Sequence, residues 1–322
     1  MKAVRLHQLG GPQNLHLDDV GQPLPQAGET LVRLQAAALN HRDVFITEGR
    51  YPNIELPRIL GSDGAGEASG KAVVIDPTIG WGDDERVWRS DATILGMPRD
   101  GTFAQYVCVP ESNVHPKPEH LTMEQAAALP LAGLTAYRAA FVRGELRSGE
   151  TVLITGVGGG VQTFALLFAK AAGARAIVTS GSDEKLERAK ALGADVALNY
   201  RTDPDWHKAA RKHGAIDLAI DSAGGETFAK VLTTVRWGGR VVTYGGTAGD
   251  ATIKMFPVFW NQLDIRGSSM GSPADFRAML EFVSTHRITP AVDRVYDLAD
   301  CAAAAERMRE AGQFGKIVLR IV

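Results

Sequence analysis

The chain has 322 residues, 45% of them hydrophobic, which predicts roughly two domains that each bury a core. The formal net charge is −2, and no basic run is long enough to follow nucleic-acid phosphates, so we expect no nucleic-acid partner. The opening MKAVRLHQLGG has no long apolar stretch, and the apolar run at 164–177 contains Lys170 and Arg175. We therefore expect no signal peptide, no membrane span and a cytoplasmic location. Cys108 and Cys301 are the two cysteines, and we interpret them as reduced thiols.

The first part of the chain, residues 1–118, has the pattern of a β-rich domain. Short apolar runs are separated by Gly, Pro and Asp, which is typical of strands joined by turns. We expect strands at residues 2–6, 30–39, 71–75 and 103–109. Residues 83–100 are largely polar and predict an exposed loop.

In residues 119–268, short apolar runs alternate with helical patterns. We expect strands at 151–155, 174–180, 195–199, 216–221 and 238–245, and helices at 161–173, 182–193 and 226–237. Ser182 or Asp183 can cap the second of these helices, and Gly193 marks its end. This alternation indicates βαβ units and hence a parallel sheet.

The last part of the chain, residues 269–322, contains few elements. The sequence predicts helices at 274–286 and 300–312 and a strand at 315–322. Three elements do not easily form a core of their own, so we expect them to return to the first part. The expected domains are therefore 1–118 plus 269–322, which is discontinuous, and 119–268, which is inserted in it.

A glycine cluster follows the strand at 151–155 and precedes a helix. Its members are Gly156, Gly158, Gly159 and Gly160. A pyrophosphate needs backbone N–H groups at a helix N-terminus and no side chains in the way, so this strand–loop–helix unit predicts a dinucleotide site rather than a flexible turn. Val161 occupies the third glycine position of G-x-G-x-x-G, which bears on how closely the helix packs on the strand.

The end of the next strand predicts NADPH rather than NADH. An NAD-specific fold places an acid there to bind the ribose 2′-hydroxyl. Here the strand ends in Thr179, Ser180 and Gly181, and no acid precedes Asp183. Lys185 alone would read as a solvated helix residue, but beside a tip without an acid its ammonium can pair with a 2′-phosphate.

Many segments together resemble a known family. They are MKAVRLHQLGGPQNL, AAALNHRDVFITEGRYP, PRILGSDGAGE, AAALPLAGLTAYRAA, the glycine cluster, SDEKLERAKALGAD, LNYR, IDSAGG, GGRVVTYGG and FGKIVL. The chain resembles the medium-chain dehydrogenase/reductase superfamily, and specifically its zinc-independent quinone oxidoreductase branch. The resemblance implies an α/β fold in which a Rossmann doubly wound parallel sheet is inserted in a GroES-like β-rich catalytic domain. It also implies a cleft between the two domains, where the nicotinamide meets the substrate.

The resemblance implies that neither zinc ion of the zinc-containing members is present. Their catalytic metal is ligated at three points that align with Asn40, Ser62 and Ala132, and none of these is a good zinc ligand. Residues 80–105, where relatives carry a structural zinc, contain no cysteine. The segment 66–76 is shorter than in typical relatives, and we expect a trimmed loop there.

The resemblance also extends the cofactor site beyond the glycine cluster. Lys185 and Tyr200 match positions that hold the 2′-phosphate of NADPH, although Tyr200 could instead simply pack on the domain. Further candidates follow later strands, near the ribose and the carboxamide: Ser222, Ala223, Gly245, Gly246, Thr247, Gly267, Ser268 and Met270.

The expected chemistry is hydride transfer to a quinone or another conjugated carbonyl. Without a Lewis acid, reversible alcohol oxidation is disfavoured, whereas charge that spreads over a conjugated acceptor needs only hydrogen-bond donors. The candidates for orienting the acceptor or the cofactor amide are Asn40 and Thr135, with Arg42 and Tyr51 nearby in sequence. The alternatives are a turn-forming role for Asn40 and a salt bridge from Arg42 to Asp43 or Asp63.

Two other functions remain open at this point. One is reduction of the C=C bond of enals or enoyl thioesters, and the other is an NADPH-binding structural or regulatory role with little catalysis. The apolar, strand-like segment 252–269 predicts a sheet edge that pairs in a homodimer, with a substrate-facing wall as the alternative.

Overall fold

The computed structural model describes residues 1–322, which divide into two compact units. The first unit comprises Met1–Leu134 and Gly271–Val322, and the second comprises Thr135–Met270. The second unit therefore interrupts the first. The boundary falls within helix α3 (Pro130–Tyr137), so residues 119–134 belong to the first unit, later in the chain than the boundary expected at 118.

The first unit contains most of the strands. They are β1 (Lys2–Leu6), β2 (Leu15–Asp19), β3 (Glu29–Ala38), β4 (Arg58–Ile59), β5 (Asp63–Ala68), β6 (Lys71–Ile75), β7 (Thr78–Ile79), β8 (Thr93–Ile94), β9 (Tyr106–Pro110), β10 (Val114–Pro116), β17 (Val292–Asp297) and β18 (Lys316–Arg320). Its other helices are α1 (His41–Thr47), α2 (Met123–Ala127), α9 (Pro273–Thr285) and α10 (Cys301–Arg309).

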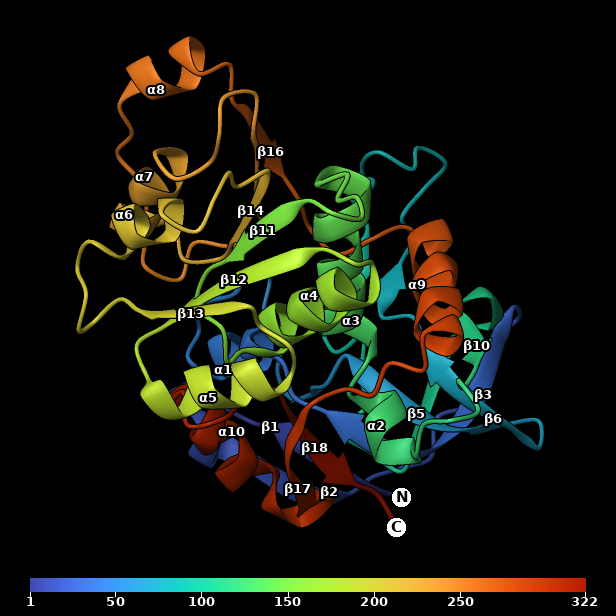
Figure 1. Ribbon diagram of the computed structural model, residues 1–322. Coiled ribbons are helices and arrows are strands. Elements are labelled where there is room, and N and C mark those ends of the chain that lie inside the picture. Colours follow the sequence, from blue (N-terminus) through green and yellow to red (C-terminus); the bar gives the residue numbers. More distant parts are fainter. The chain divides into compact units, whose positions relative to one another are not determined.

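The largest sheet of this unit pairs strands from residues 29–116 with the two C-terminal strands. Its order is β10-β6-β5-β3-β18-β17, and β9 also pairs with β3 (Figure 1). Strand β18 runs antiparallel to β3, with Val318 opposite Ala38. The N–H of Leu39 then donates to the carbonyl of Ile317 at 3.0 Å. This register brings residue 316 beside the start of α1.

Two segments of this unit, 66–76 and 83–100, were expected to form loops. The segment 66–76 is a tight hairpin, in which only Ser69 and Gly70 separate β5 from β6, both with positive φ (+49° and +74°). The loop at 83–100 is exposed as far as Asp91, but the residues from Ile94 to Met97 are buried. The prediction of an exposed loop was therefore wrong for that end, where apolar side chains pack into the core.

The second unit is built around a parallel sheet. Its strands are β11 (Thr151–Ile154), β12 (Arg175–Ser180), β13 (Val196–Asn199), β14 (Leu218–Asp221), β15 (Arg240–Thr243) and β16 (Asp264–Gly267). Its helices are α4 (Gly160–Ala171), α5 (Asp183–Ala191), α6 (Trp206–Arg211), α7 (Gly225–Leu232) and α8 (Met255–Trp260), and a π-helical segment spans Arg138–Arg143.

The strand order is β13-β12-β11-β14-β15-β16, and all neighbours are parallel (Figure 1). Numbered along the chain, this order is 3-2-1-4-5-6, that of a Rossmann fold. Leu153, Ile177 and Val241 pack on one face against side chains of α6 and α7. Helix α4 lies against β11 and β12. The expected fold, a Rossmann sheet inserted in a GroES-like β-rich domain, is confirmed.

The segment 252–269 differs from its prediction. Only Asp264–Gly267 forms a strand, β16, and Met255–Trp260 forms helix α8 instead. Phe256, Phe259 and Trp260 are spaced so that they lie on one face of a helix. The ring of Phe256 therefore contacts those of Phe259 and Trp260, at centroid distances of 5.4 and 5.5 Å. The strand prediction was therefore wrong for the first part of this segment.

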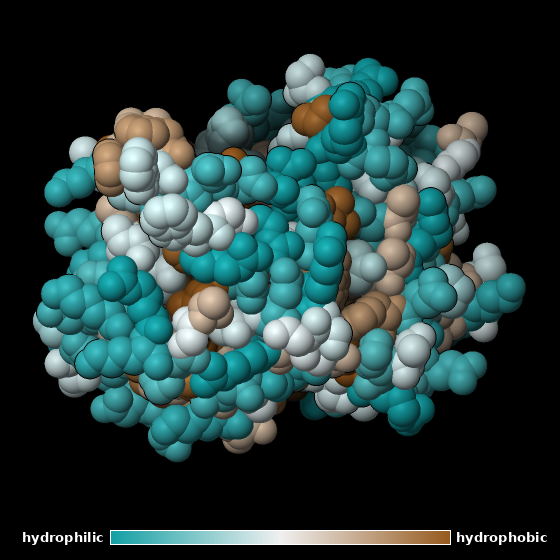
Figure 2. Space-filling view, turned by 45° about the horizontal axis from the view of Figure 1, so that its top comes forward, coloured by the Kyte–Doolittle hydropathy of each residue, from teal (hydrophilic) through white to brown (hydrophobic).

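No helix of the structure has the length and apolar character needed to cross a membrane. Figure 2 shows a face on which hydrophilic residues predominate and apolar residues are scattered between them.

Candidate functional site

The predicted cofactor residues gather at one edge of the parallel sheet. Because all six strands run the same way, their carboxyl ends lie along the same edge. The residues that follow these ends are Gly156 after β11, Gly181 after β12, Tyr200 after β13, Ser222 after β14, Gly245 after β15 and Ser268 after β16. Ligands of open α/β sheets bind outside this edge, where the strand order reverses, here between β11 and β14.

The glycine loop has the geometry that a phosphate requires. Helix α4 begins at Gly160, and its N-cap residue, Gly159, offers no side chain to the first-turn N–H groups. Gly158 has φ +134°, and a Cβ there would lie 2.7 Å from Cδ and 3.5 Å from Nζ of Lys185. The Lys185 side chain therefore lies against the loop, and only glycine leaves room for it.

The tip of β12 brings the predicted 2′-phosphate residues together. A Cβ on Gly181 would lie 2.9 Å from Cε2 of Tyr200 and 2.8 Å from Nε of Arg201. The backbone N–H of Lys185 donates to Oγ of Ser182, which caps α5, at 3.4 Å. Tyr200 and Arg201 thus approach the short tip, and the Lys185 side chain lies against the glycine loop.

The first acid after this tip in the sequence, Asp183, already has a hydrogen-bond partner. Asp183 accepts a hydrogen bond from Nδ2 of Asn199 at 2.7 Å. Arg201 was not among the sequence candidates, although it directly follows Tyr200 in LNYR, and a basic residue just past a strand end is a signal that could have found it.

The ends of β14 and β15 meet through their loops. The N–H of Thr247 donates to the carbonyl of Ser222 at 3.2 Å, and the N–H of Ala248 donates to that of Ala223 at 2.7 Å. Nε2 of Gln162, in the first turn of α4, donates to Oγ of Ser222 at 2.6 Å. Gln162 therefore connects α4 to the loop after β14. This contact was not predicted from the sequence.

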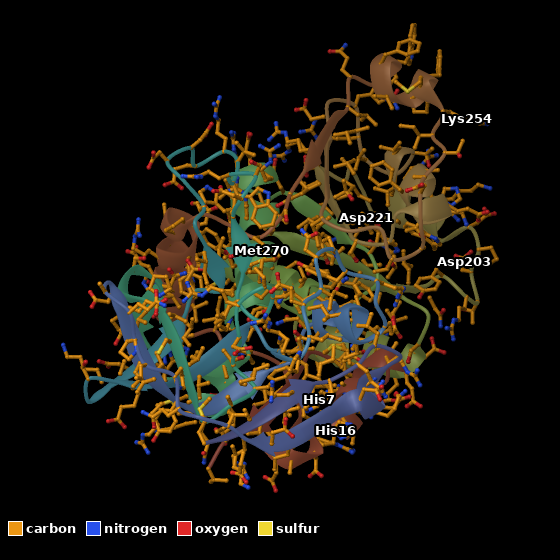
Figure 3. All side chains as sticks on the ribbon, turned by 180° about the vertical axis from the view of Figure 1, so that it is seen from behind. His7, His16, Asp203, Asp221, Lys254 and Met270 are labelled. Atoms are coloured by element: carbon orange, nitrogen blue, oxygen red, sulfur yellow. The ribbon has the colours of Figure 1, made fainter.

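Asp221, at the end of β14, stabilises the same edge from within. It is fully buried, accepts from Oγ1 of Thr155 at 2.5 Å and from the N–H of Gly224 at 2.9 Å, and lies inside the second unit (Figure 3). These bonds join the ends of β11 and β14, the two strands that flank the point where the order reverses.

The edge also contains buried polar atoms without partners. The N–H of Ser268 donates to the carbonyl of Thr243 at 2.9 Å, but its Oγ has no partner, and neither has the hydroxyl of Tyr244. Burial raises the pKa of Tyr244, so this hydroxyl keeps its proton. Such groups are the kind that a polar ligand satisfies. The residues of the second unit therefore fit a dinucleotide, which the glycine loop, the β12 tip and these strand ends would hold.

Of the catalytic candidates, Thr135 lies in the second unit, where it is buried on α3. Asn40, Arg42 and Tyr51 lie in the first unit, at and after the start of α1. The backbone N–H of Asn40 donates to Oδ2 of Asp43 at 2.8 Å, as the residue before a helix commonly does. This bond uses only the backbone of Asn40, so the role of its side chain as a hydrogen-bond donor to an acceptor stays a prediction.

Arg42 differs from its alternative. Its guanidinium makes no salt bridge to Asp43 or Asp63. Instead, Nη1 donates to Oγ of Ser62 at 2.6 Å and to the carbonyl of Leu95 at 2.9 Å, and the guanidinium lies 4.8 Å from the ring centre of Tyr51. Arg42 is only 8% exposed, and its Nη2 has no partner.

The side chain of Asn40 belongs to a buried network that includes a residue missed by the sequence. Its Nδ2 donates to Oδ2 of Asp63 at 2.9 Å, and its Oδ1 accepts from Nζ of Lys316 at 2.7 Å. Burial raises the pKa of the neighbouring Asp43 to about 6, although the charge of Arg42 opposes this shift. No pattern in the sequence links Lys316 to Asn40.

The residues at the zinc-aligned positions do not fit a zinc ion. Asn40 and Ser62 already bond to Lys316 and Arg42, and Ala132 has no donor atom in its side chain. No group of three or more His, Cys, Asp or Glu side chains in the chain is arranged to hold a metal.

The strand order, the glycine loop and the strand-end residues together define a dinucleotide-binding protein. Residues 160–285 match the family described as zinc-binding dehydrogenase, and residues 26–119 match the alcohol dehydrogenase GroES-like domain. The chain belongs to the medium-chain dehydrogenase/reductase superfamily, whose members include the relatives below.

Three known proteins illustrate the similarity. The zinc-type alcohol dehydrogenase-like protein YogA of Leptosphaeria maculans is 38% identical over 95% of this chain and 94% of its own length. A crystal structure described as an NAD-dependent alcohol dehydrogenase is 38% identical, with a TM-score of 0.94 over 100% of both chains. A crotonyl-CoA carboxylase/reductase is 26% identical, with a TM-score of 0.90 over 100% of this chain and 88% of that one.

Proposed function

We propose that this protein is a zinc-independent, NADPH-dependent reductase that transfers hydride to a quinone or another conjugated carbonyl, as the quinone oxidoreductase branch of its superfamily does. The observation that carries the cofactor choice is the β12 tip. Tyr200 and Arg201 lie against Gly181, Lys185 lies against the glycine loop, and the first acid after the tip is bonded to Asn199. A ribose 2′-phosphate would find cationic donors there, whereas a 2′-hydroxyl would find no carboxylate at the strand tip itself, because that first acid, Asp183, lies on α5.

The relatives leave the choice of coenzyme open. One similar structure is described as NAD-dependent. Our proposal rests on the residues of this chain, and it predicts that the coenzyme preference differs from the one in that description.

The catalytic part of the proposal assigns roles to residues of the first unit. NADPH, when bound, supplies the hydride. Asn40 has one side-chain N–H that is not used by Asp63, and it can donate to an acceptor oxygen that gains negative charge. Lys316 and Asp63 hold that amide in one orientation, and Arg42 and Tyr51 contribute positive charge and a hydroxyl nearby. Thr135 stays a candidate for orienting the cofactor amide, and bulk water can supply the proton.

The test is NADPH consumption with a panel of acceptors under identical conditions. Saturable turnover of a benzoquinone or naphthoquinone that exceeds turnover of simple enals supports the proposal. Turnover of primary alcohols with NAD⁺, abolished by a chelator, would contradict it. Absence of turnover with every acceptor, despite NADPH binding, would favour the structural or regulatory alternative.

A second candidate is reduction of enoyl thioesters. It is favoured by the similarity to a crotonyl-CoA carboxylase/reductase. The same panel tests it, because a crotonyl thioester would then be reduced with a higher kcat/KM than any quinone.

A further inference from the structure

The most unusual feature of the first unit is a fully buried lysine whose hydrogen bonds are complete. Lys316 is 2% exposed. Its Nζ donates to the carbonyl of Leu39 at 2.7 Å, to Oδ1 of Asn40 at 2.7 Å and to Oδ2 of Asp63 at 2.8 Å. An ammonium has three N–H donors, so these three oxygens use all of them. The side chain is thus a cation enclosed by oxygen ligands.

Both carboxylate oxygens of Asp63, the anionic partner of Lys316, also have hydrogen-bond partners. Asp63 is completely buried, and its Oδ2 also accepts from Nδ2 of Asn40 at 2.9 Å. Its Oδ1 accepts from the backbone N–H of Leu131 at 2.8 Å, one residue before Ala132. The network therefore links β18, the start of α1, β5 and α3, which carry or adjoin all three positions aligned with zinc ligands.

A second buried cation, Arg42, bonds to Ser62, the other polar residue that aligns with a zinc ligand. Arg42 donates through Nη1 to Ser62, which precedes Asp63, and makes no ion pair of its own. Around Asn40 and Ser62 there are thus two side-chain cations, Lys316 and Arg42. A divalent metal that entered here would meet like charge at short range, with its oxygen ligands already engaged.

We propose that the ammonium of Lys316 is the resident cation of this site. It occupies an oxygen cage formed by Leu39, Asn40 and Asp63, and with Arg42 it excludes a divalent metal from the positions that align with zinc ligands. Lys316 acts as a positioning residue, because it orients the amide of Asn40 rather than contacting an acceptor. This inference is independent of the choice between NADPH and NADH.

The first test is chemical rescue of Lys316→Ala. The substitution removes the equivalent of a propylammonium ion and leaves Asp63 buried without its cation. We expect Tm to fall by roughly 5–10 °C. Propylammonium should restore part of this loss by refilling the cage, whereas tetramethylammonium, which has no N–H donors, should not. The control is Lys208→Ala, whose lysine pairs with Asp205 at the surface and should respond to neither.

Rescue also separates positioning from simple stability. At a temperature well below the Tm of Lys316→Ala, propylammonium should still raise kcat of acceptor reduction, because the Asn40 amide is held again, whereas a role in stability alone would leave kcat unchanged there. An unchanged Tm in Lys316→Ala, or equal recovery with both ammonium ions, would overturn the proposal.

If Lys316→Ala does not fold, the double variant Lys316→Met with Asp63→Asn replaces it. It removes the buried cation and the buried charge together, so we expect it to fold and to ignore propylammonium. A rise in its Tm with propylammonium would contradict the assigned cage.

A separate experiment tests metal binding by the unmodified protein. We expect no change in Tm and no heat of binding when Zn²⁺ or Co²⁺ is added. Stoichiometric binding of either ion that Asn40→Ala abolishes would overturn the proposal directly.

Discussion

At the scale of single residues, the proposed preference for NADPH rests on two cations, Lys185 and Arg201. Lys185 lies against Gly158 in the glycine loop, and Arg201 lies against Gly181 at the tip of β12, so one cation adjoins each of the two segments. Lys185 was predicted from a strand tip that lacks an acid, and Tyr200 was predicted from the family resemblance. Lys316 could not be predicted in this way, since it meets Asn40 across 276 residues of sequence through the pairing of β18 with β3.

We expect Lys185→Ala and Arg201→Ala each to weaken NADPH binding about tenfold or more, because a hydrogen bond to a charged group contributes about 1.5–3 kcal/mol. NADH binding should change little, since NADH lacks the 2′-phosphate. Calorimetric titration of both coenzymes measures the two effects. Lys190→Ala is the control, because Lys190 lies on the same helix but pairs with Glu187 at the surface. A loss of NADPH and NADH affinity in equal measure would contradict the assignment.

Asp76 predicts a pH dependence of stability. Burial raises the pKa of its carboxyl from the ordinary 3.8 to about 7, and its Oδ1 accepts from the N–H of Thr78 at 2.9 Å. Between these two pKa values the folded state binds more protons than the unfolded state, so this group lowers stability as the pH rises from about 4 to 7. The penalty is complete above the folded pKa and amounts to at most about 4 kcal/mol.

Asp76→Asn removes this titration while keeping an acceptor for Thr78. We expect the Tm of the variant relative to the unmodified protein to rise by several degrees between pH 5 and pH 8, measured by thermal unfolding. Asp205→Asn, at an exposed carboxyl, should show no such gain. A pH-independent difference for Asp76→Asn would refute the assignment.

At the scale of elements, hydrophobic runs located the strands better than they identified helix α8. The strands β11, β12, β14 and β15 lie within the ranges expected from the sequence, because short buried runs between Gly-rich turns have few other readings. In the segment before β16, the strand was predicted from the apolar composition alone, and the spacing of the apolar residues was not considered. Met255, Phe256, Phe259 and Trp260 recur at intervals of three and four, which is the spacing of a helix face.

The loop before α4 depends on Gly158. We expect Gly158→Ala to weaken NADPH binding about tenfold, equivalent to ~1.4 kcal/mol, because the new Cβ displaces Lys185 and strains the loop. Gly149→Ala is a matched control, since Gly149 also has positive φ (+82°) but open space around its Cβ position. Both variants should lose similar stability in thermal unfolding, and only Gly158→Ala should lose coenzyme affinity. Equal NADPH affinity in the two variants would count against the role of this loop.

At the scale of the whole molecule, the exposed aromatic residues of α8 point to a homodimer. Met255, Phe256, Phe259 and Trp260 are each more than half exposed, and β16 is an unpaired edge of the sheet. Lys254, which precedes α8, lies at the outer end of the second unit (Figure 3). An open strand edge next to an apolar helix is a surface that a second copy of the chain can cover.

We expect light scattering to give about twice the chain mass of 34.5 kDa. Phe256→Glu and Phe259→Glu should shift the mass towards that of one chain, because a charge at each position opposes burial of the apolar face. Leu24→Glu, at an exposed apolar residue of the first unit, is the control. A mass of one chain for the unmodified protein would contradict the dimer.

The division into two units was the most predictable property of the whole molecule, because residues 269–322 contain too few elements for a core of their own. The boundary was harder to predict. It lies within the continuous helix α3, and nothing in the composition near Leu134 separates the residues that pack with each unit.

Coenzyme preference is measured most directly by calorimetric titration of the unmodified protein with NADPH and with NADH at one pH and ionic strength. We expect NADPH to bind at least about tenfold more tightly, a difference of ~1.4 kcal/mol that Lys185 and Arg201 supply. Equal affinities, or tighter binding of NADH, would contradict it.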